Sequence, residues 1–151
     1  MANTSAVIGV AAAVAAHNSP RPEPPMPEIF KQFALADRVA LITGANGGLG
    51  LETAQAFLEA GARAAYCVDL PEHPSATWSA VKEYVAAMGL NGRLEYVQGD
   101  VANQDKIWDI ANKIGDAEGR LDVCVAGAGI VDKDGKASTL DYRAADYDKV
   151  T

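Results

Sequence analysis

The chain has 151 residues, of which 49% are hydrophobic and 22% charged, and its formal net charge is −7 at pH 7. This length allows one domain with a substantial hydrophobic core. The acidic balance lacks the basic footprint of proteins that bind nucleic acid or anionic membranes, so we expect neither partner.

The first 36 residues have the composition of a tail and linker. Residues 1–16 are rich in alanine, and residues 19–27 hold five of the seven prolines of the chain. Proline at this density favours an extended spacer. Residues 6–16 have the length of the apolar region of a secretory signal, but no basic residue precedes them and they are too short to span a bilayer. We expect a disordered or weakly helical tail, with a targeting signal as the alternative.

A glycine-rich turn between a strand and a helix organises the rest of the chain. Residues 39–42 are a short apolar run that predicts a buried strand, and Gly44, Gly48 and Gly50 follow it. A helical pattern begins at once, with apolar residues three and four positions apart. This layout directs backbone N–H groups and the positive end of a helix toward a phosphate. The glycines allow the backbone to approach the phosphate closely.

Beyond this turn, predicted strands and helices alternate. Further strands are expected over 64–68, 94–98 and 121–125. Two helical patterns lie between them, with Trp78, Val81, Val85 and Met88 on one face of the first and Ile107, Ile110, Ala111 and Ile114 on one face of the second. Single helices alternating with strands predict a parallel sheet with right-handed crossovers.

Acidic or small residues follow three of the predicted strands. Asp69 follows the second strand, at the distance from the glycine turn where a carboxylate binds the ribose hydroxyls of the adenosine. Such a carboxylate accepts from both hydroxyls of NAD and repels the 2′-phosphate of NADP. Asp100 and Val101 follow the third strand, and the small residues Ala126 to Gly129 follow the fourth.

The two cysteines, Cys67 and Cys124, fall in the second and fourth predicted strands. With another strand between them, their backbones would lie roughly 9–10 Å apart, beyond the ~7 Å reach of a disulfide. We therefore expect two buried free thiols, which suits a reducing compartment such as the cytoplasm. The cysteines and histidines lack the spacing of metal ligands, so no metal site is expected.

Taken in order, the T-G-x-x-x-G-x-G turn, Asp69, Asp100-Val101 and the Ala126–Gly129 stretch resemble the short-chain dehydrogenase/reductase family. The resemblance implies a Rossmann-like doubly wound parallel sheet, truncated after about four strands in the order 3-2-1-4. Residues 37–151 would then be a partial NAD(P)-binding domain behind the tail of residues 1–36. One departure is that Ala126 and Gly127 stand where the family usually has two asparagines.

The resemblance also implies the residues of the cofactor site. In the family, the acid that follows the third strand contacts the adenine ring. The implied cofactor-binding residues are Gly44, Asn46, Gly48, Leu49, Gly50, Asp69, Asp100, Val101, Ala126, Ala128 and Gly129. The expected cofactor is NAD, with NADP less favoured.

The chemistry of the family requires a Tyr-x-x-x-Lys pair and a serine, and no tyrosine in this sequence has a lysine four positions later. No catalytic residue is therefore assigned. Two hypotheses stay open. The chain is either a fragment of an NAD(P)-dependent oxidoreductase that interconverts an alcohol and a carbonyl, or a non-catalytic dinucleotide-binding module or inactive splice form.

The full-length parent is expected to bind nicotinamide dinucleotide and a small carbonyl or alcohol substrate, and to form a homo-oligomer. In the strand order 3-2-1-4, the fourth strand of the fragment is an apolar edge with unpaired backbone groups. We therefore expect the isolated chain to be marginally folded and to self-associate.

Overall fold

The computed structural model describes residues 29–130, together with residues 10, 14, 18 and 19. The chain divides into two units, Met1–Ala34 and Leu35–Thr151. In the first unit, helix α2 spans Ile29–Gln32, and the Lys31 carbonyl accepts from the Ala34 N–H at 3.2 Å just beyond its end. Within the described part of the chain, no helix is both long and apolar enough to cross a membrane. The predicted division into a tail of residues 1–36 and a domain of residues 37–151 stays a prediction.

The second unit contains a sheet of four parallel strands. The strands are β1 (Val39–Thr43), β2 (Ala64–Asp69), β3 (Arg93–Gln98) and β4 (Val123–Ala126). They lie side by side in the order β3-β2-β1-β4 and pair in parallel. The parallel sheet and its strand order confirm the predicted Rossmann-like fold.

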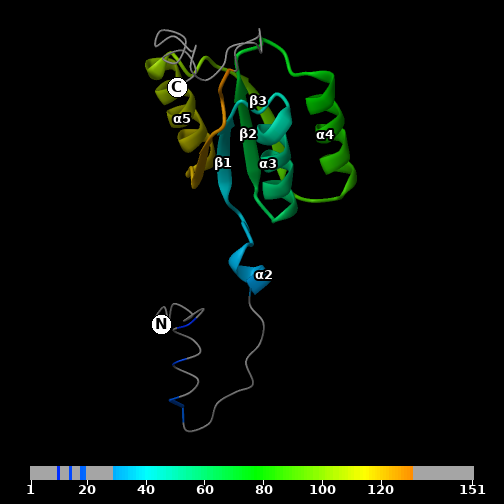
Figure 1. Ribbon diagram of the computed structural model, residues 1–151, viewed down its shortest axis with the longest axis vertical. Coiled ribbons are helices and arrows are strands. Elements are labelled where there is room, and N and C mark those ends of the chain that lie inside the picture. The colour runs from blue at the N-terminus through cyan, green and yellow to red at the C-terminus, as the bar shows by residue number, and fades with distance from the viewer. Residues whose placement is uncertain (1–9, 11–13, 15–17, 20–28, 131–151) are drawn as a thin grey trace, which may run out of the picture. The chain divides into compact units, whose positions relative to one another are not determined.

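Three helices connect the strands and cover both faces of the sheet. They are α3 (Gly48–Glu59), α4 (Ala76–Ala87) and α5 (Gln104–Glu118). Helices α3 and α4 lie on one face and α5 on the other (Figure 1). The start of α5 is capped by Asn103, whose side chain accepts from the Lys106 N–H, and its end is set by Gly119 in the left-handed region.

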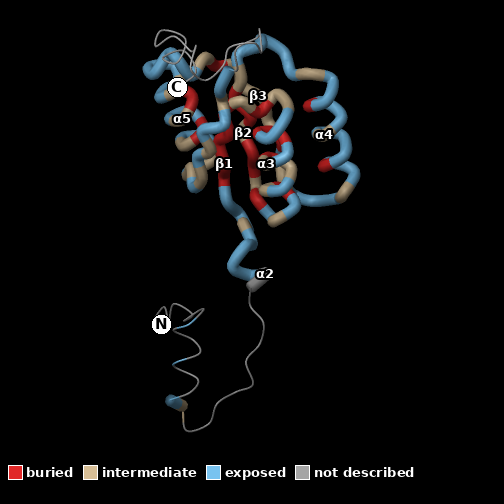
Figure 2. Tube along the Cα trace, in the orientation of Figure 1, coloured by how far each residue is buried: buried red, intermediate tan, exposed pale blue. Residues whose placement is uncertain are grey.

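The core consists of two layers of side chains, one on each face of β1. Every residue of β1 is buried, which explains why residues 39–42 are a continuous apolar run (Figure 2). Successive side chains of a strand point to opposite faces. Ala40 and Ile42 therefore pack in one cluster with the apolar faces of α3 and α4, whereas Val39 and Leu41 pack in the other with α5.

The prediction of two buried thiols is wrong for Cys124. Cys67 is buried and Cys124 is exposed, and both are free. Cys124 pairs with Leu41 and so lies on the α5 face, but α5 does not reach across β4 to cover it. Val123 and Val125, on the other face of β4, pack against the α3 and α4 cluster.

Two carboxylates hold the amino ends of the strands. Asp122 accepts from the Val39 N–H at 2.9 Å and from Arg38 at 2.8 Å, and it pairs with Arg120. The hydrogen bond from Arg120, followed by the one from Val39, holds the pKa of Asp122 well below its usual range. Because Asp122 serves as this acceptor, β4 begins at Val123 rather than at residue 121 as predicted.

The second carboxylate is Glu118, at the end of α5. Its side chain is nearly buried and accepts from the Tyr66 hydroxyl at 2.6 Å, and it pairs with Arg93 and Arg63. Burial, and then this hydrogen bond, raises the pKa of Tyr66. Both carboxylates therefore lie at the end of the sheet where the strands begin, and the glycine turn lies at the other end.

Candidate functional site

The glycine turn lies at the carboxyl end of β1 and contacts the segment that follows β4. Gly44 has φ 69°, and its N–H donates to the Val68 carbonyl at 2.8 Å. A Cβ atom on Gly44 would lie 2.7 Å from both the Cα of Ala128 and the carbonyl oxygen of Gly127. A Cβ on Gly50 would lie 2.5 Å from the carbonyl oxygen of Gly44. These two positions therefore exclude side chains on steric grounds.

The amino end of α3 is open on its outer side. Gly47, the residue before the helix, is extended and gives no side-chain cap. Gly48 has φ 54°, and a Cβ there would meet no atom within 4 Å. Leu49, the next residue, is 87% exposed. Uncapped N–H groups at a helix start, next to open space, suit a phosphate group.

Asp69 is joined directly to the glycine turn. Its Oδ2 accepts from the Asn46 N–H at 2.9 Å, and its Oδ1 accepts from the Leu70 N–H at 2.8 Å. Each carboxylate oxygen can accept two hydrogen bonds, so both oxygens keep capacity for a ligand hydroxyl. The side chain is partly buried at the end of β2.

The side chain of Asn46 points to the start of α4. Its Oδ1 accepts from the Ser75 N–H at 2.6 Å, and its Nδ2 lies 3.5 Å from the carbonyl of His73. The Ser75 hydroxyl donates to the Asn46 carbonyl at 2.7 Å and accepts from the Trp78 N–H at 3.0 Å. Ser75 is the N-cap of α4, and the sequence gave no sign of its contact with the glycine turn.

Thr43 fixes the segment after β4. This nearly buried residue accepts, through Oγ1, from the N–H groups of Gly127 and Ala128, both at 3.2 Å. Ala126 ends β4 directly opposite Thr43, and a Cβ on Gly129 would meet no atom within 4 Å. Sequence reasoning missed this role of Thr43, although a threonine before the first glycine was part of the motif.

Asp100 and Val101 form the turn between β3 and α5. Asp100 Oδ1 accepts from the Ala102 N–H at 2.9 Å, and its carbonyl accepts from the Asn103 N–H at 3.0 Å. Val101 is exposed. The Gly99 N–H donates to the Asp69 carbonyl at 2.8 Å, which joins this turn to the end of β2.

All the predicted cofactor residues therefore lie at the carboxyl edge of the sheet, where the four strands end. A large exposed aliphatic residue also follows each strand at this edge. These residues are Leu49, Leu70, Val101 and Ile130. Exposed aliphatic side chains beside hydrogen-bonding groups suit a ligand with flat rings. Leu70 and Ile130 were not predicted as site residues.

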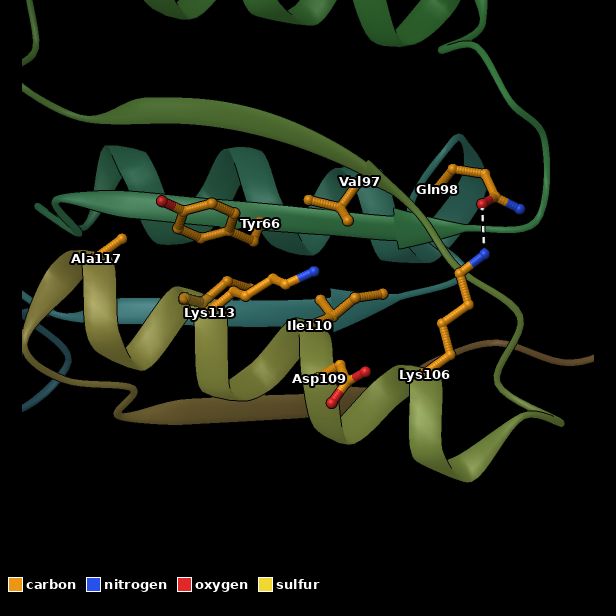
Figure 3. Close-up of a pocket in the computed structure, with 9 residues that line it drawn as sticks. Tyr66, Val97, Gln98, Lys106, Asp109, Ile110, Lys113 and Ala117 are labelled. Atoms are coloured by element: carbon orange, nitrogen blue, oxygen red, sulfur yellow. Dashed lines mark hydrogen bonds between the residues drawn. The ribbon is translucent and has the colours of Figure 1, made fainter.

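A separate pocket of about 520 Å³ lies between the sheet and α5 (Figure 3). Tyr66, Val97 and Gln98 line it from the strands, and Ile110 is among the residues that line it from α5. The Nζ of Lys106 donates to Gln98 at 2.7 Å across one end. No predicted cofactor residue lines this pocket, and among the described residues no cluster of three or more potential metal ligands occurs.

Comparison with known proteins places this geometry in a family. The profile of the short chain dehydrogenase family matches residues 38–151. A curated relative, 3beta-hydroxysteroid dehydrogenase 2 of Eggerthella lenta, is 37% identical over 107 residues, which are 71% of this chain and 39% of the relative. The chain thus spans about two fifths of the length of this curated relative.

Solved structures with a similar fold come from the same family. A short chain dehydrogenase from Mycobacterium smegmatis superposes with a TM-score of 0.62 at 29% identity, over 78% of this chain and 46% of that one. The RhlG/NADP active-site complex from Pseudomonas aeruginosa gives a TM-score of 0.50 at 30% identity, over 65% of this chain and 37% of that one.

Proposed function

We propose a function from one premise: the chain belongs to the short chain dehydrogenase family. Oxidoreductases are among its curated relatives, and the family uses nicotinamide dinucleotide cofactors and small substrates. We infer that this chain binds such a dinucleotide along the carboxyl edge of its sheet. It would be the cofactor-binding part of an enzyme that interconverts an alcohol and a carbonyl.

One observation carries the proposal: the backbone packing at Gly44 and Gly50. Two positions where a Cβ would collide with backbone atoms keep the turn narrow, while Gly48, between them, borders open space. A plain strand-to-helix turn needs no such combination. The pyrophosphate would lie at the start of α3, and the adenosine ribose at Asp69.

We further propose that NAD is preferred over NADP. The carboxylate of Asp69 would repel a 2′-phosphate, and Asn46 supplies no positive charge to offset the repulsion. The Pseudomonas relative is described with NADP, so membership of the family alone does not imply a preference for NAD. In this chain, the proposed preference for NAD over NADP depends on Asp69.

The hydride-transfer step needs an acid and a positioned substrate, and the 151 residues contain no Tyr-x-x-x-Lys pair. We propose that the catalytic residues belong to a continuation of the chain, in a cytoplasmic enzyme that forms a homo-oligomer.

The alternative is a non-catalytic dinucleotide-binding module or inactive splice form. A transcript that continues in frame into Tyr-x-x-x-Lys would favour the first, and purified 151-residue protein should show no dehydrogenase turnover in either case.

The test of the cofactor site compares two matched glycine variants, Gly48→Ala and Gly89→Ala. Both positions have positive φ, and at both an added Cβ meets no atom within 4 Å. Each variant should lose about 1–2 kcal/mol of stability from backbone strain. Only Gly48→Ala should weaken NAD binding, by about tenfold or more, because its methyl group takes the place of the pyrophosphate.

Isothermal titration with NAD, NADP and ADP-ribose on the unaltered chain and both variants gives the measurement. Equal loss of NAD affinity in the two variants would assign the effect to strain. No binding of any dinucleotide by the unaltered, folded chain would refute the proposed site.

A further inference from the structure

We infer that Ser75 is a positioning residue for the adenosine end of the proposed dinucleotide site. It holds Asn46 in the orientation that directs the Asn46 N–H at Asp69. The inference rests on the proposed function, because it assigns the group that fixes the ribose-binding carboxylate. Among the residues predicted to contact the cofactor, Ser75 forms hydrogen bonds with Asn46.

Ser75 binds Asn46 on two sides. The Ser75 N–H donates to Asn46 Oδ1 at 2.6 Å, and the Ser75 hydroxyl donates to the Asn46 carbonyl at 2.7 Å. Both contacts are partly buried and join residues 29 positions apart in the sequence. With the side chain and the carbonyl both held, rotation of the Asn46 backbone is restricted.

The restriction matters because the Asn46 N–H is the donor to Asp69 Oδ2, at 2.9 Å. The other oxygen of Asp69 is held by the next N–H along the chain, that of Leu70. The Asn46 contact is therefore the long-range bond that sets the direction of the carboxylate. Without Ser75, this bond has no support from α4.

Helix capping alone does not account for these contacts. A cap at Ser75 needs only the bond from the Trp78 N–H to the Ser75 hydroxyl oxygen, at 3.0 Å. The hydroxyl hydrogen remains available after capping, and here it is directed to the glycine turn. Ser79, on the same helix, is exposed and donates its hydroxyl to the Ser75 carbonyl at 3.1 Å, not to the glycine turn.

The test uses Ser75→Gly, Ser75→Thr and, as a matched control, Ser79→Ala. Glycine is an acceptable N-cap residue that removes the hydroxyl without adding charge, and threonine keeps the hydroxyl. Two quantities are measured: NAD affinity by titration, and the hydrogen-exchange rate of the Asn46 amide by NMR in the absence of cofactor.

In Ser75→Gly, we expect NAD affinity to fall about 2- to 12-fold, the range for one neutral hydrogen bond, and the Asn46 amide to exchange faster. Ser75→Thr should restore both values, and Ser79→Ala should change neither. A stable Ser75→Gly variant with unchanged NAD affinity and unchanged Asn46 exchange would overturn the inference. If the unaltered chain binds no dinucleotide, the proposed function fails. Faster exchange of the Asn46 amide in Ser75→Gly would then still show that Ser75 holds the turn, and an unchanged rate would show that it does not.

Discussion

Asp69 is the residue on which the proposed cofactor preference depends. Its carboxylate is oriented by the Asn46 and Leu70 N–H groups and keeps acceptor capacity on both oxygens. Replacing Asp69 with serine should narrow the preference for NAD over NADP by about 1–3 kcal/mol, the scale of a charged hydrogen bond. Competitive titration of the two cofactors measures the change. Tighter binding of NADP than of NAD by the unaltered chain would contradict the assignment.

The two cysteines should differ sharply in reactivity. Burial raises the pKa of the Cys67 thiol to about 11, whereas Cys124 lies exposed on β4. Because the thiolate is the reactive form, Cys124 should be labelled by a thiol reagent at pH 8 while Cys67 stays protected until the chain unfolds. Mass spectrometry after timed labelling measures both sites, with a Cys124→Ser variant as control. Equal labelling rates in the folded chain would show that β2 is not packed as described.

At the scale of the elements, the junction of β1 and β4 should be sensitive to acid. Arg120, the Val39 N–H and Arg38 hold the pKa of Asp122 below that of an unfolded aspartate. A carboxylate with a lowered pKa stabilises the fold fully above its unfolded pKa of about 4, and this stability is lost as the pH falls through the folded pKa.

The Asp122→Asn variant should therefore be less stable than the unaltered chain at pH 7, and the difference should shrink below about pH 4. Urea denaturation from pH 7 downward measures it. Glu59→Gln, on the exposed face of α3, serves as the control for the loss of one negative charge. A difference that stays constant across this range would show that the charge of Asp122 is not involved.

The sequence was most informative about the helices and strands. β1 and β2 are short apolar runs because their residues are mostly buried, and periodic apolar residues indicated α3, α4 and α5. Glycines and acids after the strands could be recognised because the motif is local. The roles of Thr43 and Ser75 could not, since their partners lie 85 and 29 positions away in sequence. Cys124 was misjudged because an apolar run does not reveal which face of an edge strand is left uncovered.

For the whole molecule, the exposed side of β4 is the main expected weakness. In the described part of the chain, β4 pairs with β1 alone, and Cys124 and Ala126 are exposed. Unpaired strand edges recruit other chains. The 151-residue protein should therefore self-associate into species of mixed size in size-exclusion chromatography and melt with low cooperativity, while a chain extended through further strands should give one defined, soluble species. A monodisperse monomer with a cooperative melt would instead favour a stand-alone module.

The contact between the glycine turn and the segment after β4 also has a consequence for the order of folding. The Thr43 hydroxyl accepts from the Ala128 N–H, 85 positions later in the sequence. At the usual rate of synthesis, about 5–20 residues per second, Thr43 leaves the ribosome roughly 4–17 s before Ala128. Contacts between β1, β2 and α3 are local and form early, whereas closing this long loop is slow. The nascent chain can thus pair β1 with β2, and β2 with β3, before β4 and the segment after it have been made, so a cofactor present during synthesis would meet an unfinished glycine turn.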